Sequence, residues 1–88
     1  MFKYILKLFV VDKDDLSILA ISNVKAFCEK NMKNNYELTI IDIDKQIELA
    51  QKNRILAIPT LIKEEPSPEQ RFIGNLSDTE NLSRLFRL

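Results

Sequence analysis

The feature that most constrains this chain is the proline in the apolar stretch from Arg54 to Lys63. Pro59 has no N–H to donate to a sheet, so it is excluded from the interior of a central strand but tolerated at a strand's first residue. The residues from Thr60 onward are strand-formers, which predicts a strand from Thr60 to Lys63. Ile58 is biased towards extended backbone by the ring that follows it. The sequence therefore predicts a loop that enters a β-sheet at Ile58-Pro59, and it leaves open whether the bond between them is cis or trans.

The N-terminal half predicts a strand, a helix and a second strand. Phe2 to Val11 alternates, and by Leu8 both faces are apolar, which is typical of a central strand covered on both sides. From Leu16 to Asn31 apolar residues recur at helical spacing, behind a polar loop whose carboxylates suit a helix N-terminus. Tyr36 to Ile43 alternates again. Such a unit is expected to be parallel and right-handed.

The segment on either side of the Ile58-Pro59 junction predicts a short helix and two strands. The short helix spans Asp44 to Asn53, and it is only weakly amphipathic. After the strand that Pro59 begins, a turn region from Glu64 to Glu69 leads into a short strand at Gln70 to Ile73. Gly74 is the only glycine, and we expect it to hold a backbone angle that other residues accept poorly.

The end of the chain predicts a helix from about Asp78. Ser77-Asp78-Thr79-Glu80 has the form of a capping box, which makes Ser77 the expected N-cap. Leu82, Leu85 and Phe86 recur at helical spacing and are expected to form the buried stripe of this helix. The whole order is β-α-β-α-β-β-α, as in the thioredoxin fold. It predicts an α/β, thioredoxin-like domain with a four-stranded mixed sheet, spanning residues 1–88 as a single unit.

Composition excludes several classes of function. Thirteen basic residues balance thirteen acidic ones and are spread along the chain, so nothing attracts nucleic acid or an anionic membrane. The longest apolar run near the start, Leu8 to Val11, is too short to span a bilayer. A single cysteine rules out an internal disulfide and fits the reducing cytoplasm, which is the predicted location. The chain has no histidine, the commonest general base and metal ligand.

Redox and metal chemistry also lack residues to carry them. A dithiol enzyme would place Cys-x-x-Cys where the first strand meets the first helix, but that junction reads Lys13-Asp14-Asp15-Leu16. Cys28 lies on the apolar face of the helix, so we expect a buried core cysteine. The nearby aspartates lack the glycine turn and distal glutamate of a calcium loop, and helix capping is the favoured interpretation. We therefore expect no enzymatic activity, no catalytic residue, no cofactor and no metal.

Four segments together resemble the KaiB family of circadian clock proteins. They are Lys3 to Val10, Tyr36 to Asp42, Ile55 to Leu61 and Ile73 to Ser77, in matching order and spacing. The resemblance implies a non-enzymatic protein that docks on the ATPase ring of KaiC and gathers or displaces other proteins, such as KaiA or a histidine kinase. It also implies two folds that differ in the C-terminal half. One is thioredoxin-like, monomeric and competent to bind, and the other is a differently wired oligomer. In thioredoxin-like proteins the Xaa-Pro bond at such a junction is cis.

Several residues depart from the family pattern, so other partners stay open. Asp12 stands where the family usually has glycine, and Asn75 where it usually has aspartate. Leu19, Ser22 and Thr39 replace basic residues, and the chain ends without the family's longer tail. One alternative is a relative with a partner outside the clock. Another is an input module of a signalling histidine kinase, although no kinase follows here.

Of the two folds that the resemblance implies, we expect the thioredoxin-like one to dominate, because the local signals for the last helix agree with it.

The predicted partner-binding surface surrounds Pro59. In a thioredoxin-like arrangement, the end of the first strand, the start of the third and the turn before the last helix meet on one side, and loops on a rigid sheet commonly carry recognition. The residues assigned to this surface are Asp14, Asp15, Arg54, Ile58, Pro59, Gly74 and Asn75. The second strand is expected at a sheet edge, where Tyr36 and Thr39 mark a secondary site for a partner strand. The alternative is that Pro59 merely begins a strand.

Overall fold

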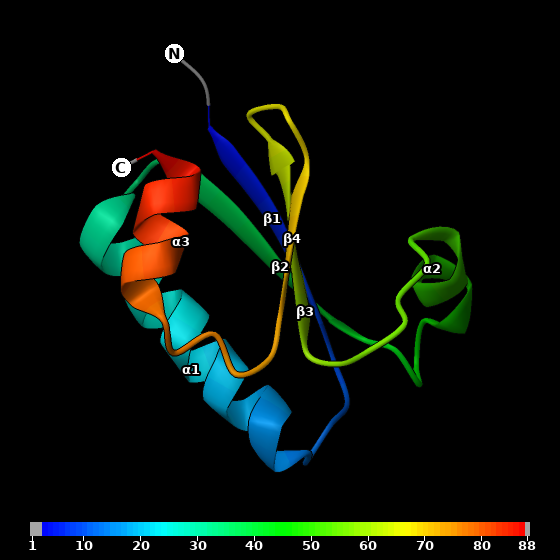
Figure 1. Ribbon diagram of the computed structural model, residues 1–88. Helices are drawn as coiled ribbons and strands as arrows, with labels where there is room; N and C mark the ends of the chain where they lie inside the picture. The colour runs from blue at the N-terminus through cyan, green and yellow to red at the C-terminus, as the bar shows by residue number, and fades with distance from the viewer. Residues whose placement is uncertain (1–2, 88) are drawn as a thin grey trace.

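The structure, a computed structural model, describes residues 3–87 and is organised around a four-stranded mixed sheet (Figure 1). The elements are β1 (Tyr4–Val10), α1 (Asp15–Asn31), β2 (Tyr36–Asp42), α2 (Ile47–Lys52), β3 (Thr60–Glu65), β4 (Gln70–Ile73) and α3 (Thr79–Phe86). Their order is the predicted one. The first residue of the predicted opening strand, Phe2, lies outside the described residues.

The strand order in the sheet is β2-β1-β3-β4, with β1 and β3 in the centre. β1 runs parallel to β2 and antiparallel to β3, and β3 runs antiparallel to β4. β1 is central because both of its faces are apolar, as the sequence predicted. Leu6 and Leu8 point to one face and Phe9 to the other, and all three are at most 1% exposed.

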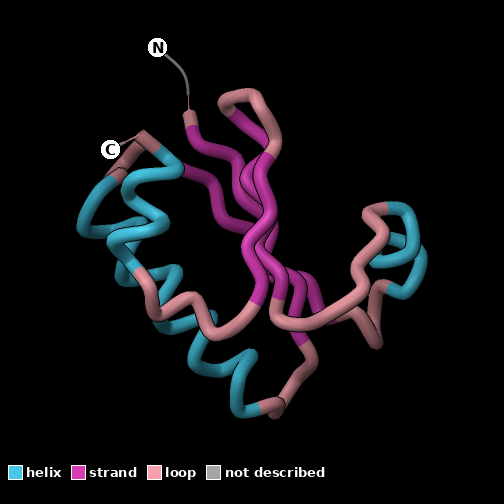
Figure 2. The backbone as a smooth tube through the Cα atoms, in the orientation of Figure 1, coloured by secondary structure: helices cyan, strands magenta, loops and turns pink. Residues whose placement is uncertain are grey.

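The helices cover the two faces unequally. α1 and α3 lie side by side on one face, whereas α2 stands alone on the other (Figures 1 and 2). The core under α1 and α3 is accordingly the larger. The smaller core, on the α2 face, consists of Phe9, Ile41 and Ile62, with Ile43, Leu49 and Ile55 packed against it.

An aromatic cluster joins the ends of the chain in the larger core. The rings of Tyr4 and Phe86 stack with their centroids 5.7 Å apart, and Phe27 meets Phe86 edge-on at 5.5 Å. Phe72 of β4 lies 5.6 Å from the same ring. Phe86 therefore contacts aromatic side chains from β1, α1 and β4, and it anchors α3 to the sheet.

Three sequence predictions about the C-terminal half need correction. α2 is shorter than the predicted helix, mainly because it begins three residues later, after a turn in which the Lys45 and Gln46 N–H groups bond to the Asp42 carbonyl. None of its residues is buried, and Ile47 is 56% exposed. β3 continues past Lys63 to Glu65, since a register shift opposite Ile5 and Leu6 lets the pairing with β1 continue. Leu85 is 39% exposed, not buried, because only one side of α3 faces the sheet.

The N-cap of α3 is Asp78, not Ser77. The Asp78 carboxylate accepts a hydrogen bond from the Asn81 N–H at 3.0 Å, and the helix begins at Thr79. Ser77 instead donates its N–H to the Asn75 side chain at 3.1 Å, which places it in the turn before the helix. The predicted start of the helix is right to within one residue, but the capping side chain is the next one along.

Replacing Asp78 with alanine is therefore expected to lower the free energy of unfolding by ~0.5–2 kcal/mol, because an N-cap oxygen satisfies an otherwise unpaired helix N–H. Ser77→Ala is the matched control and should change stability little, since Ser77 caps nothing. Urea denaturation followed by circular dichroism measures both. A larger loss from Ser77→Ala than from Asp78→Ala would contradict this assignment.

Within residues 3–87, no helix is both long enough and apolar enough to cross a bilayer.

Candidate partner-binding surface

Three loops leave the sheet at the same end. Phe9, next to the last residue of β1, pairs with Thr60, the first residue of β3. Thr60 also pairs with Ile73, the last residue of β4. The end of β1, the start of β3 and the end of β4 therefore lie at the same end of the sheet. A hydrogen bond of 3.0 Å from the Gly74 N–H to the Pro59 carbonyl ties two of these loops together. We call this end, formed by residues 12–16, 54–59 and 74–75, the junction surface. It gathers the loops that the sequence analysis assigned to one side.

Pro59 lies beneath this surface. The Ile58-Pro59 bond is cis, the Pro59 side chain is fully buried and Ile58 is half-buried. The Thr60 hydroxyl donates to the Ala57 carbonyl at 2.6 Å, which holds the loop as it enters the strand. Pro59 therefore shapes the loop, and only its neighbours are exposed to a partner.

The two predicted aspartates have different surroundings. Asp14 is the N-cap of α1, and its carboxylate accepts from the Ser17 N–H at 2.9 Å. Ser17 is itself buried, and its hydroxyl accepts from the Val11 N–H, so this turn is closely held. Asp15 is exposed in the first turn of α1. Asp14 thus has a structural task, and Asp15 is the carboxylate that a partner can reach.

Arg54 is exposed and holds an unusual backbone conformation. Its φ is +53°, in the left-handed region, just after the end of α2. The Ile55 N–H reaches back to the Ala50 carbonyl at 3.1 Å, a hydrogen-bonding pattern that closes a helix around a left-handed residue. Glycine or asparagine usually occupies such a position, because other side chains crowd the following carbonyl. Arginine therefore carries a backbone cost at this position, as Arg87 does at the end of α3, and its side chain is exposed to solvent.

Arg71 on β4 lies beside Arg54, and sequence reasoning missed it. The Arg71 guanidinium donates to the Arg54 carbonyl at 3.4 Å and lies 3.6 Å from the Glu69 carboxylate. Ile73, two residues along the same strand face, is 67% exposed, and Leu56 in the Arg54 loop is 96% exposed. The alternation of β4 around buried Phe72 is the signal that could have placed Arg71 on the outer face.

Gly74 and Asn75 form the third part of the junction surface. Gly74 has φ +111°, as the sequence predicted for the only glycine. Asn75 is half-buried; its backbone carbonyl accepts from the Asn23 amide at 2.7 Å. Both residues are therefore placed by contacts with neighbouring elements.

The secondary site lies on β2, which is an edge strand of the sheet. Thr39 is exposed, and the Tyr36 hydroxyl donates to the Glu29 carboxylate of α1 at 2.6 Å. This hydrogen bond raises the pKa of Tyr36 to about 12. The edge is thus open to another strand along Thr39, while Tyr36 is already engaged.

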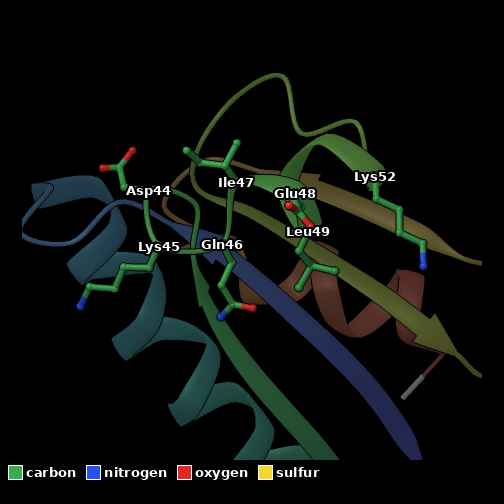
Figure 3. A pocket seen from close by; sticks show the side chains of 7 residues that line it. All are labelled: Asp44, Lys45, Gln46, Ile47, Glu48, Leu49 and Lys52. Atoms are coloured by element: carbon green, nitrogen blue, oxygen red, sulfur yellow. The ribbon is translucent and has the colours of Figure 1, made fainter.

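A hollow beside α2 is lined by polar, charged and apolar side chains. It has a volume of about 570 Å³, and Figure 3 shows charged side chains of both signs around exposed Ile47. Its lining residues are Asp44, Lys45, Gln46, Ile47, Glu48, Leu49 and Lys52. Within residues 3–87, no group of three or more His, Cys, Asp or Glu side chains is placed to hold a metal ion.

Cys28 is confirmed as a core residue. It is 0% exposed and lies in the second half of α1, away from the helix N-terminus where a thiol would be activated. Burial, with a smaller contribution from the negative charge of Glu29, raises its pKa to about 12. The thiol therefore stays protonated at neutral pH.

Known structures share this architecture. The solution structure of the N-terminal domain of Synechococcus elongatus SasA matches with a TM-score of 0.77 and 25% identity, covering 98% of this chain and 81% of that one. The thioredoxin Deadhead of Drosophila melanogaster also gives 0.77, at 22% identity over 97% of this chain and 79% of its own. The predicted thioredoxin-like fold is confirmed.

The sequence itself matches a narrower group. The circadian clock oscillator protein KaiB of Prochlorococcus marinus subsp. pastoris is 44% identical over 79 residues, which is 90% of this chain and 74% of that protein. The family model of the KaiB domain matches residues 7–88. Since this match spans nearly the whole chain, the protein belongs to the KaiB family of circadian clock proteins.

Proposed function

We propose that this protein is a non-enzymatic binding module that docks on a KaiC-type ATPase ring through the junction surface. Family membership supports a role in clock regulation, and a histidine kinase is a candidate competitor for the same partner. The N-terminal domain of SasA shares the thioredoxin-like fold. A KaiA-like protein is a further candidate for displacement or recruitment. The module acts in the cytoplasm as a monomer in its thioredoxin-like form.

The observation that carries the proposal is the exposed Arg54 in a left-handed conformation. This backbone conformation favours glycine or asparagine, yet an arginine occupies the position, with the Arg71 guanidinium against its carbonyl. Exposed Arg54 and Arg71, with exposed Leu56 in the Arg54 loop and exposed Ile73 on the Arg71 face of β4, suit a partner segment that carries carboxylates among apolar side chains. Asp15 adds an exposed acidic group to the junction surface.

Two extensions of this proposal come from other features. The open edge of β2 near Thr39 provides a secondary site, where a partner strand can extend the sheet. A second fold of the C-terminal half would require Leu76, Leu82 and Phe86 to leave the larger core, in which each is at most 7% exposed. The thioredoxin-like form is accordingly the dominant one in this proposal.

Replacing Arg54 with glutamate tests the proposal. Because the charge of an exposed residue of the junction surface is inverted, we expect affinity for the KaiC-type ATPase of the same organism to fall at least about tenfold, the equivalent of ~1.4 kcal/mol. Arg54→Gly removes the cation but suits the backbone, so it should also weaken binding while keeping the fold. Fluorescence titration gives the affinities, and circular dichroism confirms folding.

Lys25→Glu is the matched control, since Lys25 is an exposed residue of α1 outside the junction surface. Its binding should stay within about twofold of the parent protein, because a distant surface charge is screened. Unchanged binding of Arg54→Glu together with a large loss in Lys25→Glu would refute the site. Absence of binding by the parent protein would refute the KaiC-type partner, and it would favour a relative with another partner.

A further inference from the structure

The loop between β4 and α3, residues 74–78, holds an unfavourable backbone conformation. Gly74 has φ +111°, which glycine accepts. Leu76 has φ +61°, in the left-handed region that leucine disfavours. The Leu76 side chain is only 7% exposed and packs in the larger core. Burying this side chain from a tight loop thus requires a backbone conformation that leucine by itself disfavours.

Hydrogen bonds from two neighbouring elements hold this loop in place. The Gly74 N–H donates to the Pro59 carbonyl at 3.0 Å, at the entrance to β3. On the other side, the Asn23 amide donates to the Asn75 carbonyl at 2.7 Å. Asn23 belongs to the middle of α1 and lies 52 residues away along the chain. The loop is therefore tied to both halves of the molecule.

Asn23 is poorly suited to its position as a helix residue. Asparagine in a helix interior is less favourable than alanine, because its amide competes for nearby backbone groups. Here the amide points away from its own helix and contacts the loop instead. Asn31, also in α1, shows the contrasting case: its amide donates to the Phe27 carbonyl of the same helix at 3.0 Å.

We propose that Asn23 is a positioning residue for partner binding, which holds the β4–α3 loop so that Gly74 and Asn75 face the junction surface in one conformation. Asn23 itself is half-buried under the Asn75 carbonyl, so its effect passes through the loop. Fixing a strained loop in advance lowers the ordering cost of binding. This inference rests on the function proposed above, and its first test needs no partner.

Amide hydrogen exchange in Asn23→Ala and Asn31→Ala measures the positioning. Each variant removes one amide-to-carbonyl hydrogen bond made by α1, and the change in exchange of the β1 amides corrects for any difference in global stability between them. In Asn23→Ala, exchange of the Gly74 and Ser77 amides should accelerate about fivefold beyond the change seen for β1, the loss expected for one hydrogen bond. In Asn31→Ala, the exchange rates of the Gly74 and Ser77 amides should change by the same factor as those of the β1 amides. Asn23→Asp, nearly isosteric, puts a carboxylate oxygen against the carbonyl and should loosen the loop more than alanine does.

Titration of the same variants against the KaiC-type ATPase measures the consequence for binding. Asn23→Ala should bind about fivefold more weakly than the parent protein, and Asn31→Ala should match the parent within about twofold. If both variants show equal, uniform exchange, Asn23 does not position the loop and the inference is wrong. If the loop loosens but affinity is unchanged, the binding role is wrong. A parent protein that fails to bind overturns the proposed function, while the exchange result still decides whether Asn23 holds the loop.

Discussion

Replacing Phe86 with alanine is expected to lower the free energy of unfolding by about 3–5 kcal/mol. Phe86 is 4% exposed and touches aromatic rings from β1, α1 and β4, with ring centroids 5.5–5.7 Å away. Removing the ring leaves a cavity bordered by a rigid sheet on one side, which cannot collapse to fill it. Small domains are stable by only ~5–15 kcal/mol. In the Phe86→Ala variant, α3 should therefore separate from the sheet at a urea concentration well below the one that unfolds the parent protein.

Leu85→Ala is the control for this substitution. Leu85 is the neighbouring residue of α3, but it is 39% exposed, so its loss should cost much less than that of Phe86. Urea denaturation gives both values, and near-ultraviolet circular dichroism reports the aromatic packing. Equal effects of the two substitutions would mean that α3 does not dock through Phe86.

Raising the pH from 9 to 10.5 is expected to remove about 1.5–2 kcal/mol of stability through Cys28. Burial raises the pKa of this thiol from its ordinary value of 9.0 to about 12. Between these two values the unfolded chain has lost the thiol proton and the folded protein has kept it. Stability therefore falls as pH rises, by about 1.4 kcal/mol for each pH unit well above 9.

Cys28→Ala separates this effect from other titrations. Tyr36 also has a raised pKa, caused mainly by its hydrogen bond to Glu29 and only in small part by the charge of Cys28. Because Tyr36 is present in both proteins, the difference between their stability curves reports mainly the thiol. Denaturant titrations at several pH values should show the two curves approaching one another above pH 9. Parallel curves would show that the thiol ionises as readily in the folded protein as in the unfolded chain.

Much of the fold could be predicted from the sequence because its strongest signals are local. The alternation of β1 with both faces apolar gives a central strand, and the missing N–H of Pro59 fixes where β3 begins. A single glycine at position 74 indicated the positive φ that is present there. Each of these signals depends on a few adjacent residues, so it can be recognised in the sequence without knowledge of the tertiary structure.

The errors arise where tertiary contacts decide between local alternatives. Ser77 and Asp78 are both good N-caps, but the Ser77 N–H bonds to the Asn75 side chain in the turn after buried Leu76, and Asp78 caps the helix. Leu85 has helical spacing, but α3 presents only one side to the sheet. Arg71 joins Arg54 through a contact between β4 and a loop 17 residues earlier, which no local pattern records.

The contact between Tyr4 and Phe86 has a consequence for synthesis on the ribosome. The Tyr4 hydroxyl donates to the Phe86 carbonyl at 3.2 Å, and the two residues stand 82 positions apart. β1, α1 and β2 can associate once residue 42 has left the exit tunnel. The Phe86 ring, which completes the core that they form, leaves the tunnel only some tens of residues later. At translation rates of ~5–20 residues per second, the nascent chain waits on the order of a few seconds with that aromatic surface open to chaperones.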